Sequence, residues 1–418
     1  MSYQRMQYNA FQFRDPVTTK HSVLQPFTRP LRACPAMNLS PVDLLLAWPD
    51  ARSPGLLVLL ASVGASALIC LTQGWHGAFS LDRCPGIQTA HHRAAPRIGG
   101  LALGLALLVA WACLEGPARH ALAALMRVSV PVVFLGLLED LTGRVRPFWR
   151  FWGAAVSATL AMAHFQYSLI DTSLWSWDPA LQWVLPGMLF TVFAVSGVTH
   201  AFNIIDGSHG LASFGVLFVL LGLGCMAQAQ GDELLLHLIV LLALAVLGFL
   251  PFNWPGGRLF LGDGGAYFLG FAVAWLAVML GARHPQLSVF ALLLTCFHPV
   301  MEVLFSMWRR TRHRVPLGQP DRLHFHSLLR RRIVAPALPP RYKTLANPLS
   351  GLLCALMSLL ANLLAMHTAT DHGASILALL AMVLLYLTVY ARMVRFHWCQ
   401  PWVLFVPRRR WEVAHGPH

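Results

Sequence analysis

The sequence predicts an all-α, polytopic integral membrane protein with about eleven transmembrane helices. The first observation is composition: 56% of the 418 residues are hydrophobic and only 11% are charged, whereas a soluble domain carries about 25% charged residues. The second is that the apolar residues form runs long enough to cross a bilayer. The third is that basic residues gather in alternate loops between these runs. Together they favour one helical bundle in a membrane over several soluble domains.

A membrane-spanning helix needs about 20 mostly apolar residues. A helix is the expected form of each run, because an open sheet cannot satisfy its backbone in lipid. The predicted spans are 55–73, 98–115, 120–138, 149–166, 181–201, 211–228, 234–251, 266–282, 287–306, 347–366 and 374–392.

This pattern divides the chain into three parts. Residues 1–54 are mostly polar, aromatic and Pro-containing, without the apolar core of a signal peptide, so we expect a disordered leader. The alternative is that the chain starts at Met37 and is correspondingly shorter. Residues 55–395 form the predicted transmembrane domain, and residues 396–418 form a basic tail. The eight cysteines include no Cys-x-x-Cys pair, so neither a disulfide framework nor a zinc site is predicted.

The net charge of +14 would suggest a nucleic-acid partner in a soluble protein, but here its distribution predicts topology, and no nucleic acid is expected. Beyond the leader, loops after even-numbered spans hold only Arg119 and Arg283, and nearly all other basic residues fall in the remaining loops and the tail. The positive-inside rule places those loops and the C-terminus in the cytoplasm. Acidic residues on that side favour a functional role; they are Asp82, Glu139, Asp140, Asp206, Asp263, Glu302 and Asp321.

The first motif is Glu139-Asp140 at the end of the third span, followed by Arg144 and Arg146. Adjacent carboxylates repel each other and persist where a cation or a proton lies between them. Magnesium takes carboxylates together with substrate phosphates, so it is the ion that this pair favours. The arginines could then hold a phosphate. The alternative is a helix end with ordinary solvated charges.

The second motif contains His200, Asn203, Asp206 and His209, after the fifth span. Asn203 and Asp206 are three residues apart and can share a helix face. Gly207 allows a tight turn and a close approach to a ligand, and the two histidines add proton transfer or hydrogen bonding near neutral pH. A helix cap would explain Gly207 but not the whole set.

The third motif joins Asn253 to Gly262-Asp263-Gly264-Gly265 at the start of the eighth span. A helix N-terminus favours anionic groups, so it could help to hold a pyrophosphate while Asp263 holds the metal. The alternative is that Asp263 is only an N-cap.

The fourth motif is Asp321-Arg322-Leu-His324-Phe-His326, in the basic loop after the ninth span. No cysteine or third histidine completes a zinc set within it, so a site for an anionic substrate is favoured. The alternative is a surface for anionic lipids, which is the role expected of Arg330–Arg332.

The fifth motif, before the second span, is the weakest. Gly99-Gly100 predicts close helix packing. The polar residues are compatible with substrate binding; they are Asp82, His91, His92, Arg93 and Arg97.

These five motifs, in this order between about residues 55 and 395, resemble the polyprenyl-phosphate N-acetylhexosamine-1-phosphate transferase family, glycosyltransferase family 4. Phospho-N-acetylmuramoyl-pentapeptide transferase is a relative of this family. Ala-Phe-Asn203-Ile-Ile-Asp206-Gly and the loop motif are most similar to the branch that uses UDP-N-acetylglucosamine or a related amino sugar. Four positions depart from the family pattern and leave the exact sugar open: Glu139 for Asp, His200 for Asn, His209 for Asp or Asn, and Ser327 for His.

The resemblance implies a Mg²⁺-dependent phosphoglycosyltransferase, with Mn²⁺ as a substitute. It would move an (N-acetyl)hexosamine-1-phosphate from a UDP-sugar to undecaprenyl phosphate or another polyprenyl phosphate. Its active site would lie at the cytoplasmic face of the inner (plasma) membrane, at the first step of O-antigen, exopolysaccharide or teichoic-acid assembly, and a homodimer is compatible with this reading. The implied roles are catalysis by Glu139, Asp140 and Asp206, metal binding by Asp263 and Asn203, and substrate binding by Arg146, His209, Asn253, Asp321, Arg322, His324 and His326.

Two other classes remain open at this point. A transporter or flippase for lipid-linked sugars would place polar groups at the bilayer midplane, often with repeat symmetry, whereas here no repeat is visible and the acids gather on one side. A catalytically weakened family member that acts as an assembly partner is kept open by the four departures.

Overall fold

The structure, a computed structural model, describes residues 54–81, 94–169, 184–316, 321 and 323–395. The chain divides into residues 1–49 and 50–418, and every described residue lies in the second part. The described residues are helical, with no strand beyond a single bridge between Leu81 and Pro96. The all-α prediction is therefore confirmed for this part, while the leader up to residue 53 and the tail 396–418 lie outside it.

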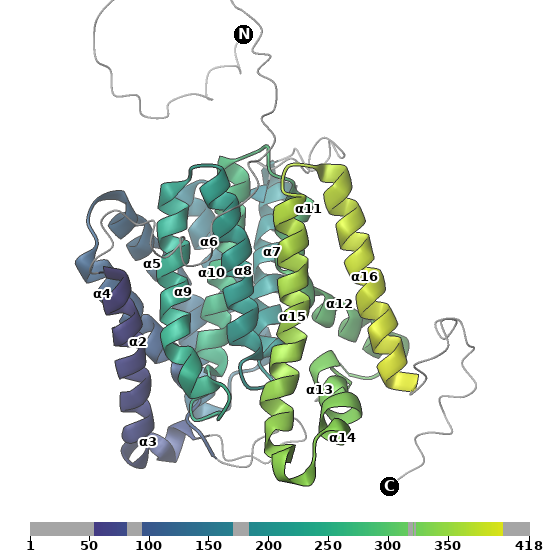
Figure 1. Cartoon of the computed structure of the whole chain (residues 1–418). Helices are drawn as coiled ribbons and strands as arrows, with labels where there is room; N and C mark the ends of the chain where they lie inside the picture. The colour runs from purple at the N-terminus through teal and green to yellow at the C-terminus, as the bar shows by residue number, and fades with distance from the viewer. Residues whose placement is uncertain (1–53, 82–93, 170–183, 317–320, 322, 396–418) are drawn as a thin grey trace, which may run out of the picture. The chain divides into compact units, whose positions relative to one another are not determined.

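The long helices lie side by side in a bundle (Figure 1). They are α2 (Pro54–Leu71), α4 (Gly99–Cys113), α5 (Gly116–Thr142), α6 (Pro147–Phe165), α7 (Val184–Ile205), α8 (Leu211–Ala229), α9 (Glu233–Asn253), α10 (Gly262–Arg283), α15 (Ala346–His367) and α16 (His372–Arg395). The shorter elements are α3 (Gln73–Ser80), α11 (Val289–Thr295), α12 (Phe297–Arg312), α13 (Phe325–Leu329), η4 (Arg330–Val334), α14 (Ala335–Ala337) and η5 (Pro340–Leu345).

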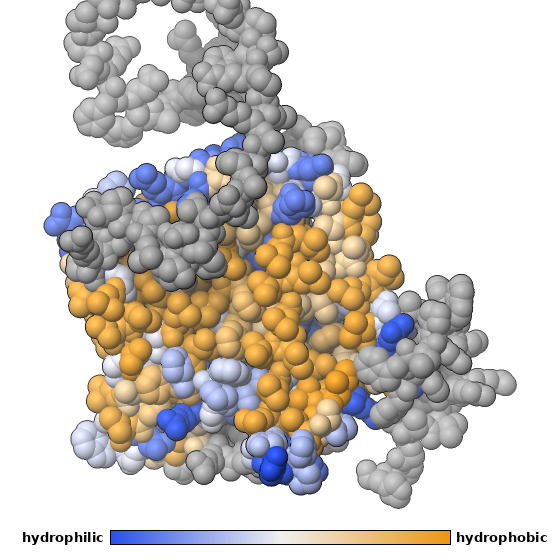
Figure 2. Space-filling model, viewed as in Figure 1, coloured by the Kyte–Doolittle hydropathy of each residue, from blue (hydrophilic) through white to orange (hydrophobic). Residues whose placement is uncertain are grey.

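Eight of the described helices are long and apolar enough to cross a membrane, and the bent pair α11–α12 would make a ninth. α4 has only 15 residues, and α6 is not among the eight. As far as they are described, ten of the eleven predicted segments fall on one helix each and the eleventh, 287–306, falls on two, but their number as spanning helices stays a prediction. Figure 2 shows a hydrophobic band across the visible face with hydrophilic residues at both edges, as expected of a surface between two polar interfaces.

The predicted span 287–306 is wrong as one continuous helix, because α11 and α12 meet at an angle of 81°. Pro299 accounts for the break, since it has no N–H to donate to the carbonyl of Thr295 four residues earlier. Asn362 of α15 replaces that donor: its Nδ2 lies 3.0 Å from the Thr295 carbonyl oxygen. Side chains from neighbouring helices commonly satisfy backbone groups freed in this way within membranes.

α10 is the most deeply buried helix of the described bundle and packs against α4, α5, α7 and α8. Small residues permit this, because they let helix backbones approach closely. A Cβ atom on Gly136 of α5 would lie 2.7 Å from the Cα of Gly264, and one on Gly100 of α4 would lie 2.6 Å from the nitrogen of Gly265. The close packing predicted at Gly99-Gly100 is confirmed, and it brings α4 and α5 against the start of α10.

At the far end of α10, Asp232 joins α9 to the end of α10. It caps α9 by accepting a hydrogen bond from the Leu235 N–H at 3.1 Å. Arg283 donates to both of its oxygens, at 2.6 and 3.0 Å, and His284 Nε2 lies 2.8 Å away. Burial alone would raise the pKa of Asp232, but the hydrogen bonds from Arg283 and His284 hold that pKa below its usual value.

Replacing Asp232 with alanine is expected to lower the free energy of unfolding by about 2–3 kcal/mol. Arg283 and His284 lose their acceptor, and α9 loses its cap. Because the folded pKa is depressed, the carboxylate stabilises the protein above its unfolded pKa of about 3.9, and this contribution disappears as pH falls through the folded value. Thermal unfolding in detergent at about pH 7 and about pH 3 tests this. A difference between wild type and variant that is equally large at both pH values would contradict it.

Candidate active site

Asp140 and the N-terminus of α10 form the centre of the site. Both carboxylate oxygens of Asp140 accept hydrogen bonds at 2.8 Å, one from the N–H of Asp263 and one from that of Gly264. The first N–H groups of a helix have no acceptor within the helix, so Asp140 caps α10 from a neighbouring helix. This contact joins the first and third motifs. It also occupies both oxygens of Asp140, whose catalytic role stays a prediction.

Two arginines contact the carboxylate of Asp263. Arg97 Nη2 lies 3.3 Å from Asp263 Oδ1 and 3.7 Å from Asp140 Oδ1, and Arg150 forms an ion pair with Asp263 Oδ2. From the sequence, Arg97 belonged only to the weakest motif and Arg150 counted only as a loop charge. One signal could have identified Arg150. It lies in the first turn of α6, shortly after Glu139-Asp140 in the sequence, so it stays close to the end of α5.

α7 and the turn that follows it bring Asp206 to the same end of the bundle. Burial, and then the negative charge of Asp263, raise the pKa of Asp206 well above its usual range. The charge of Asp140 acts in the same direction, and Arg97 opposes it. Asn203 lies just before Asp206, and its carbonyl accepts the Asp206 N–H at 3.3 Å. Three carboxyl groups from separate parts of the chain therefore lie within range of one another's charge.

Asn253, at the end of α9, holds the turn between α7 and α8. Its Oδ1 accepts hydrogen bonds from the Gly210 N–H at 2.8 Å and from Ser213 Oγ at 3.3 Å. Its Nδ2 donates to the Leu259 carbonyl at 3.0 Å. Both polar atoms of this buried side chain bond within the protein, so its predicted contact with substrate stays a prediction.

His209 lies in the turn that Asn253 holds. Its Nδ1 is 3.1 Å from the Pro255 carbonyl oxygen, and its ring centroid is 5.8 Å from that of Phe260. A carbonyl only accepts, so Nδ1 carries a proton and donates. Burial lowers the pKa of His209, which favours the neutral imidazole near pH 7.

His326 brings the loop motif against the second motif. A Cβ atom on Gly207 would lie 2.7 Å from His326 Nε2, so only glycine leaves room for this ring. The rings of His324 and His326 stack, with centroids 5.6 Å apart and planes 8° from parallel. Burial, and then neighbouring His324, lower the pKa of His326 to about 3, so this imidazole is neutral at physiological pH. The predicted binding residue Arg322 lies outside the described residues.

Asp321 anchors the loop to α12. It accepts hydrogen bonds from Ser306 Oγ at 2.6 Å and from the Leu323 N–H at 2.9 Å, and it pairs with Arg309. Burial alone would raise the pKa of Asp321, but the bonds from Ser306 and Leu323 hold it below its usual value. The carboxylate therefore stays ionised and fixes the start of the motif.

Glu302, on α12, orients His324. Its Oε1 lies 2.7 Å from His324 Nδ1 and accepts the Phe325 N–H at 3.0 Å, and its Oε2 accepts the Tyr386 hydroxyl of α16 at 2.8 Å. Because a carboxylate only accepts, His324 carries its proton on Nδ1. The sequence grouped Glu302 with the other acids of this end but assigned it no role, since its partners lie 22 to 84 residues away.

The remaining predicted residues lie at the edge of the site or beyond the described chain. Glu139 Oε2 accepts the Val145 N–H at 2.7 Å and so holds the loop between α5 and α6. Arg146 is exposed, and Arg150 is the arginine of this region that reaches Asp263. The polar residues of the fifth motif other than Arg97 lie outside the described residues: Asp82, His91, His92 and Arg93.

The oxygen atoms at this end of the bundle suit a hard divalent cation. Asp263 and Asp206 supply carboxylates, Asn203 supplies an amide oxygen, and such ligands are those that Mg²⁺ takes together with substrate phosphates. Burial is the main cause of the raised pKa of Asp206, and the negative charges of Asp263 and Asp140 add to it; a nearby cation would oppose both effects. Among the described residues, no three His, Cys, Asp or Glu side chains are already grouped to hold an ion. Magnesium binding by Asp263 and Asn203 therefore stays a prediction, and the donor atoms present are compatible with it.

Comparison with known proteins agrees with this arrangement. Residues 122–281 match the family model described as Glycosyl transferase family 4. This region runs from α5 to α10 and contains Glu139, Asp140, Asn203, Asp206 and Asp263. This part of the chain is similar to glycosyl transferase family 4, as the resemblance of the motifs predicted, and the similarity supports phosphoglycosyltransferase activity.

Individual relatives carry names that agree with the family. The chain is 27% identical over 254 residues, 59% of its length and 68% of the relative's, to a probable undecaprenyl-phosphate N-acetylglucosaminyl 1-phosphate transferase of Bacillus subtilis. It is 29% identical over 256 residues (60% and 74%) to an undecaprenyl-phosphate alpha-N-acetylglucosaminyl 1-phosphate transferase of Thermotoga maritima. A phospho-N-acetylmuramoyl-pentapeptide-transferase of Moorella thermoacetica is 35% identical over 126 residues (30% and 38%).

Proposed function

We propose that this protein transfers an (N-acetyl)hexosamine-1-phosphate from a UDP-sugar to undecaprenyl phosphate or a similar polyprenyl phosphate. UMP is released, and the sugar remains on the lipid through a pyrophosphate. The observation that carries the proposal is the meeting of three carboxylates and two arginines at one end of an apolar bundle. The relatives from Bacillus subtilis and Thermotoga maritima are named for undecaprenyl phosphate and N-acetylglucosamine, and they supply the substrate classes.

Charge neutralisation and alignment are the main tasks of such a site, because both substrates are anionic. Arg97 and Arg150 are the cationic side chains beside Asp263, and guanidinium groups hold phosphates well. Asp263 and Asn203 would bind Mg²⁺, or Mn²⁺ in its place, and the ion would polarise the pyrophosphate of the donor. Glu139 and Asp140 would orient or deprotonate the acceptor phosphate, and Asp206 would support the metal ion.

The histidine pair and the turn that it contacts form the proposed donor side. His326 lies against Gly207, and His209 lies in the same turn beside Phe260. Neutral imidazoles at these positions can donate to, or accept from, the uridine and the sugar without adding charge. Asp321 and Glu302 act through the loop, because they hold its backbone and the ring of His324.

The location and the pathway belong to the same proposal. The distribution of basic residues favours an active site at the cytoplasmic face of the inner (plasma) membrane. A lipid-linked amino sugar made there would be the first intermediate of a cell-envelope polysaccharide of the O-antigen, exopolysaccharide or teichoic-acid type.

The direct test uses the full chain, purified in detergent, with undecaprenyl phosphate, Mg²⁺ and radiolabelled UDP-N-acetylhexosamines supplied one at a time. A lipid product that requires the metal is expected with one donor. One pyrophosphate linkage is broken and another is formed, so the equilibrium constant should be near unity and added UMP should consume preformed product. If folded protein gives no product while a family relative works in the same assay, the transferase proposal fails and an assembly partner is favoured. Movement of a lipid-linked sugar across vesicles without product would instead indicate a flippase.

A further inference from the structure

The short helix α3 leaves two aromatic side chains on the surface where α2 ends. Trp75 is 89% exposed and Phe79 is 56% exposed, and their spacing of four residues places them on one helix face. The opposite face, with Gly77 and Ser80, is buried. None of the eight residues of α3 is Asp, Glu, Lys or Arg, so the exposed face carries no charged side chain.

The place of α3 in the chain is that of a bilayer interface. α2 is one of the helices that could cross a membrane, and its 18 residues rise roughly 27 Å, close to the thickness of the hydrocarbon core. α3 follows after the single residue Thr72, and Figure 1 shows it at the end of the bundle where α13 and α14 lie. Tryptophan is enriched at membrane interfaces because its ring is amphipathic.

His76 fixes α3 against α2. Its Nε2 lies 3.0 Å from the Ile69 carbonyl oxygen of α2, and its Nδ1 lies 2.5 Å from Ser80 Oγ. Because a carbonyl only accepts, Nε2 carries the proton and Nδ1 accepts from the hydroxyl. The ring therefore ties the end of α3 to the last turn of α2, and this keeps Trp75 and Phe79 on the outer side.

The end of α3 is bonded to the segment that carries Arg97. The Arg97 N–H donates to the Ser80 carbonyl at 2.9 Å. The neighbouring carbonyl, that of Pro96, accepts the Phe260 N–H at 2.8 Å, shortly before Asp263. Backbone bonds therefore connect α3, through the segment that carries Arg97, to the start of α10.

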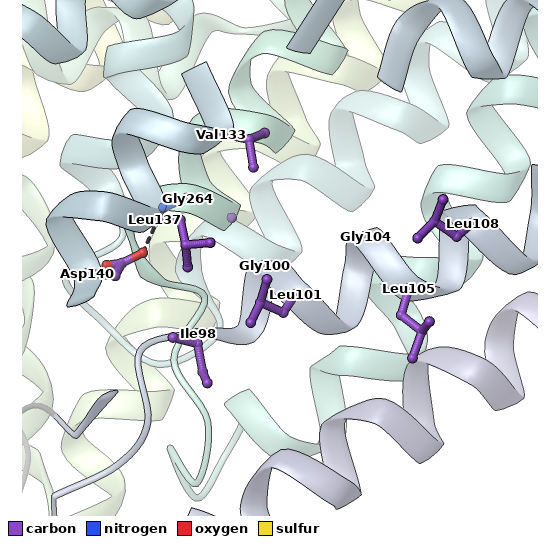
Figure 3. A pocket seen from close by; sticks show the side chains of 11 residues that line it. Ile98, Gly100, Leu101, Gly104, Leu105, Leu108, Val133, Leu137, Asp140 and Gly264 are labelled. Atoms are coloured by element: carbon purple, nitrogen blue, oxygen red, sulfur yellow. Dashed lines mark hydrogen bonds between the residues drawn. The ribbon is translucent and has the colours of Figure 1, made fainter. Parts of the chain in front are cut away.

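The guanidinium of Arg97 reaches the centre of the candidate active site from this segment. Arg97 Nη2 lies 3.3 Å from Asp263 Oδ1 and 3.7 Å from Asp140 Oδ1. Figure 3 shows Ile98, the next residue, where the segment enters α4 near Asp140 and its hydrogen bond from Gly264. A displacement of α3 would therefore move a cation of the site.

We propose that α3 is an interfacial membrane anchor, which inserts Trp75 and Phe79 among the lipid headgroups and thereby holds Arg97 in place. The partner is the surface of the bilayer that the bundle itself crosses, and the effect on catalysis rests on the proposed function. A second copy of the chain fits this face less well. Aromatic side chains bury about 150–250 Å² each, so these two supply well under the roughly 800 Å² per partner of a stable protein interface.

The membrane contact can be measured without any activity. The full chain, in nanodiscs of phosphatidylethanolamine and phosphatidylglycerol, would carry fluorescent dansylalanine in place of Trp75. The control carries the same probe in place of Leu60, which is 54% exposed near the middle of α2. A nitroxide near the lipid headgroup should quench the probe at Trp75 more than a nitroxide deep in the acyl chains, and the order should reverse at Leu60. A probe at Trp75 that neither lipid quenches, or that the deep nitroxide quenches more, would overturn the anchor.

Trp75→Ser combined with Phe79→Ser tests the connection to Arg97. Hydrogen–deuterium exchange of peptides that contain Arg97 should become about tenfold faster, the factor that 1.4 kcal/mol of lost local stability gives, because the bond to Ser80 opens more often. In nanodiscs kcat should fall by a similar factor. Trp75→Phe combined with Phe79→Trp keeps both aromatic residues and should restore both values. Trp111→Ser is the matched control and should change neither, because Trp111 is an exposed tryptophan near the opposite end of α4.

The outcomes separate the anchor from the transferase. Unchanged exchange at Arg97 in the double serine variant would overturn the connection, even if the probe at Trp75 is quenched as expected. A probe whose emission follows the number of protein copies per nanodisc, and not the nitroxide lipids, would indicate a second copy in place of the bilayer. If wild-type protein makes no product with any donor, the proposed function fails, whereas quenching and exchange still decide whether α3 anchors the chain and holds Arg97.

Discussion

Replacing Asp263 with asparagine is expected to lower kcat for lipid-product formation by about a thousandfold, the upper range for one electrostatic group in an active site. The substitution keeps the size of the side chain but removes the charge that contacts Arg97 and Arg150. It also removes the carboxylate that we propose as a ligand of the divalent cation at the start of α10. Initial rates at saturating donor and acceptor would measure the change.

Asp371→Asn provides the matched control for this substitution. Asp371 also caps a helix, since its Oδ1 accepts the Ala374 N–H at 2.9 Å, but it is exposed between α15 and α16. The Asp371→Asn variant should retain the wild-type kcat. Thermal unfolding in detergent should show that both variants, Asp263→Asn and Asp371→Asn, remain folded. A kcat within tenfold of wild type for Asp263→Asn would remove Asp263 from the centre of the mechanism.

Replacing Glu302 with alanine is expected to reduce the free energy of unfolding by about 3–5 kcal/mol. The Phe325 N–H, the Tyr386 hydroxyl and His324 would all lose their acceptor in a buried site, and unpaired buried polar groups are costly. Because the loop with His324 and His326 would lose its anchor, the KM for the UDP-sugar should rise more than the KM for the acceptor. Thermal unfolding and steady-state kinetics on the purified protein would measure both effects.

Tyr386→Phe separates stability from positioning. It removes one hydrogen bond to Glu302 Oε2 and leaves both bonds of Oε1, including the one to His324. A loss of about 1 kcal/mol is expected, with little change in donor KM. If Glu302→Ala and Tyr386→Phe raised the donor KM equally, Glu302 would not act by orienting His324.

Hydropathy was sufficient to locate the helices, because the need to satisfy the backbone in lipid leaves few alternatives for a long apolar run. It did not locate the bend at Cys296. Pro299 lies within an apolar segment, where a proline can either kink a helix or open a new one. The Thr295 carbonyl at this 81° bend is satisfied by Asn362, which is 67 residues away in the sequence.

The motifs identified which polar residues gather at one end of the bundle, but not which hydrogen bonds and ion pairs each of them forms. Asp140 is a carboxylate beside another carboxylate in the sequence, which suggests chemistry, yet both of its oxygens hold the backbone of α10. Arg150 and Glu302 have partners that only the folded chain brings near. Spacing rules within one helix cannot reveal such contacts, since they describe neighbours three or four residues apart.

The cap that Asp140 places on α10 has a consequence for local motion. The first amide protons of a helix normally exchange with solvent early, because helix ends fray at little cost. Here the amides of Asp263 and Gly264 are bonded to α5, so they exchange only when two packed helices separate. The segment that carries Asp263 therefore opens with the free energy of a helix–helix contact, and the Asp263 carboxylate keeps its position through fluctuations that would loosen an ordinary helix terminus.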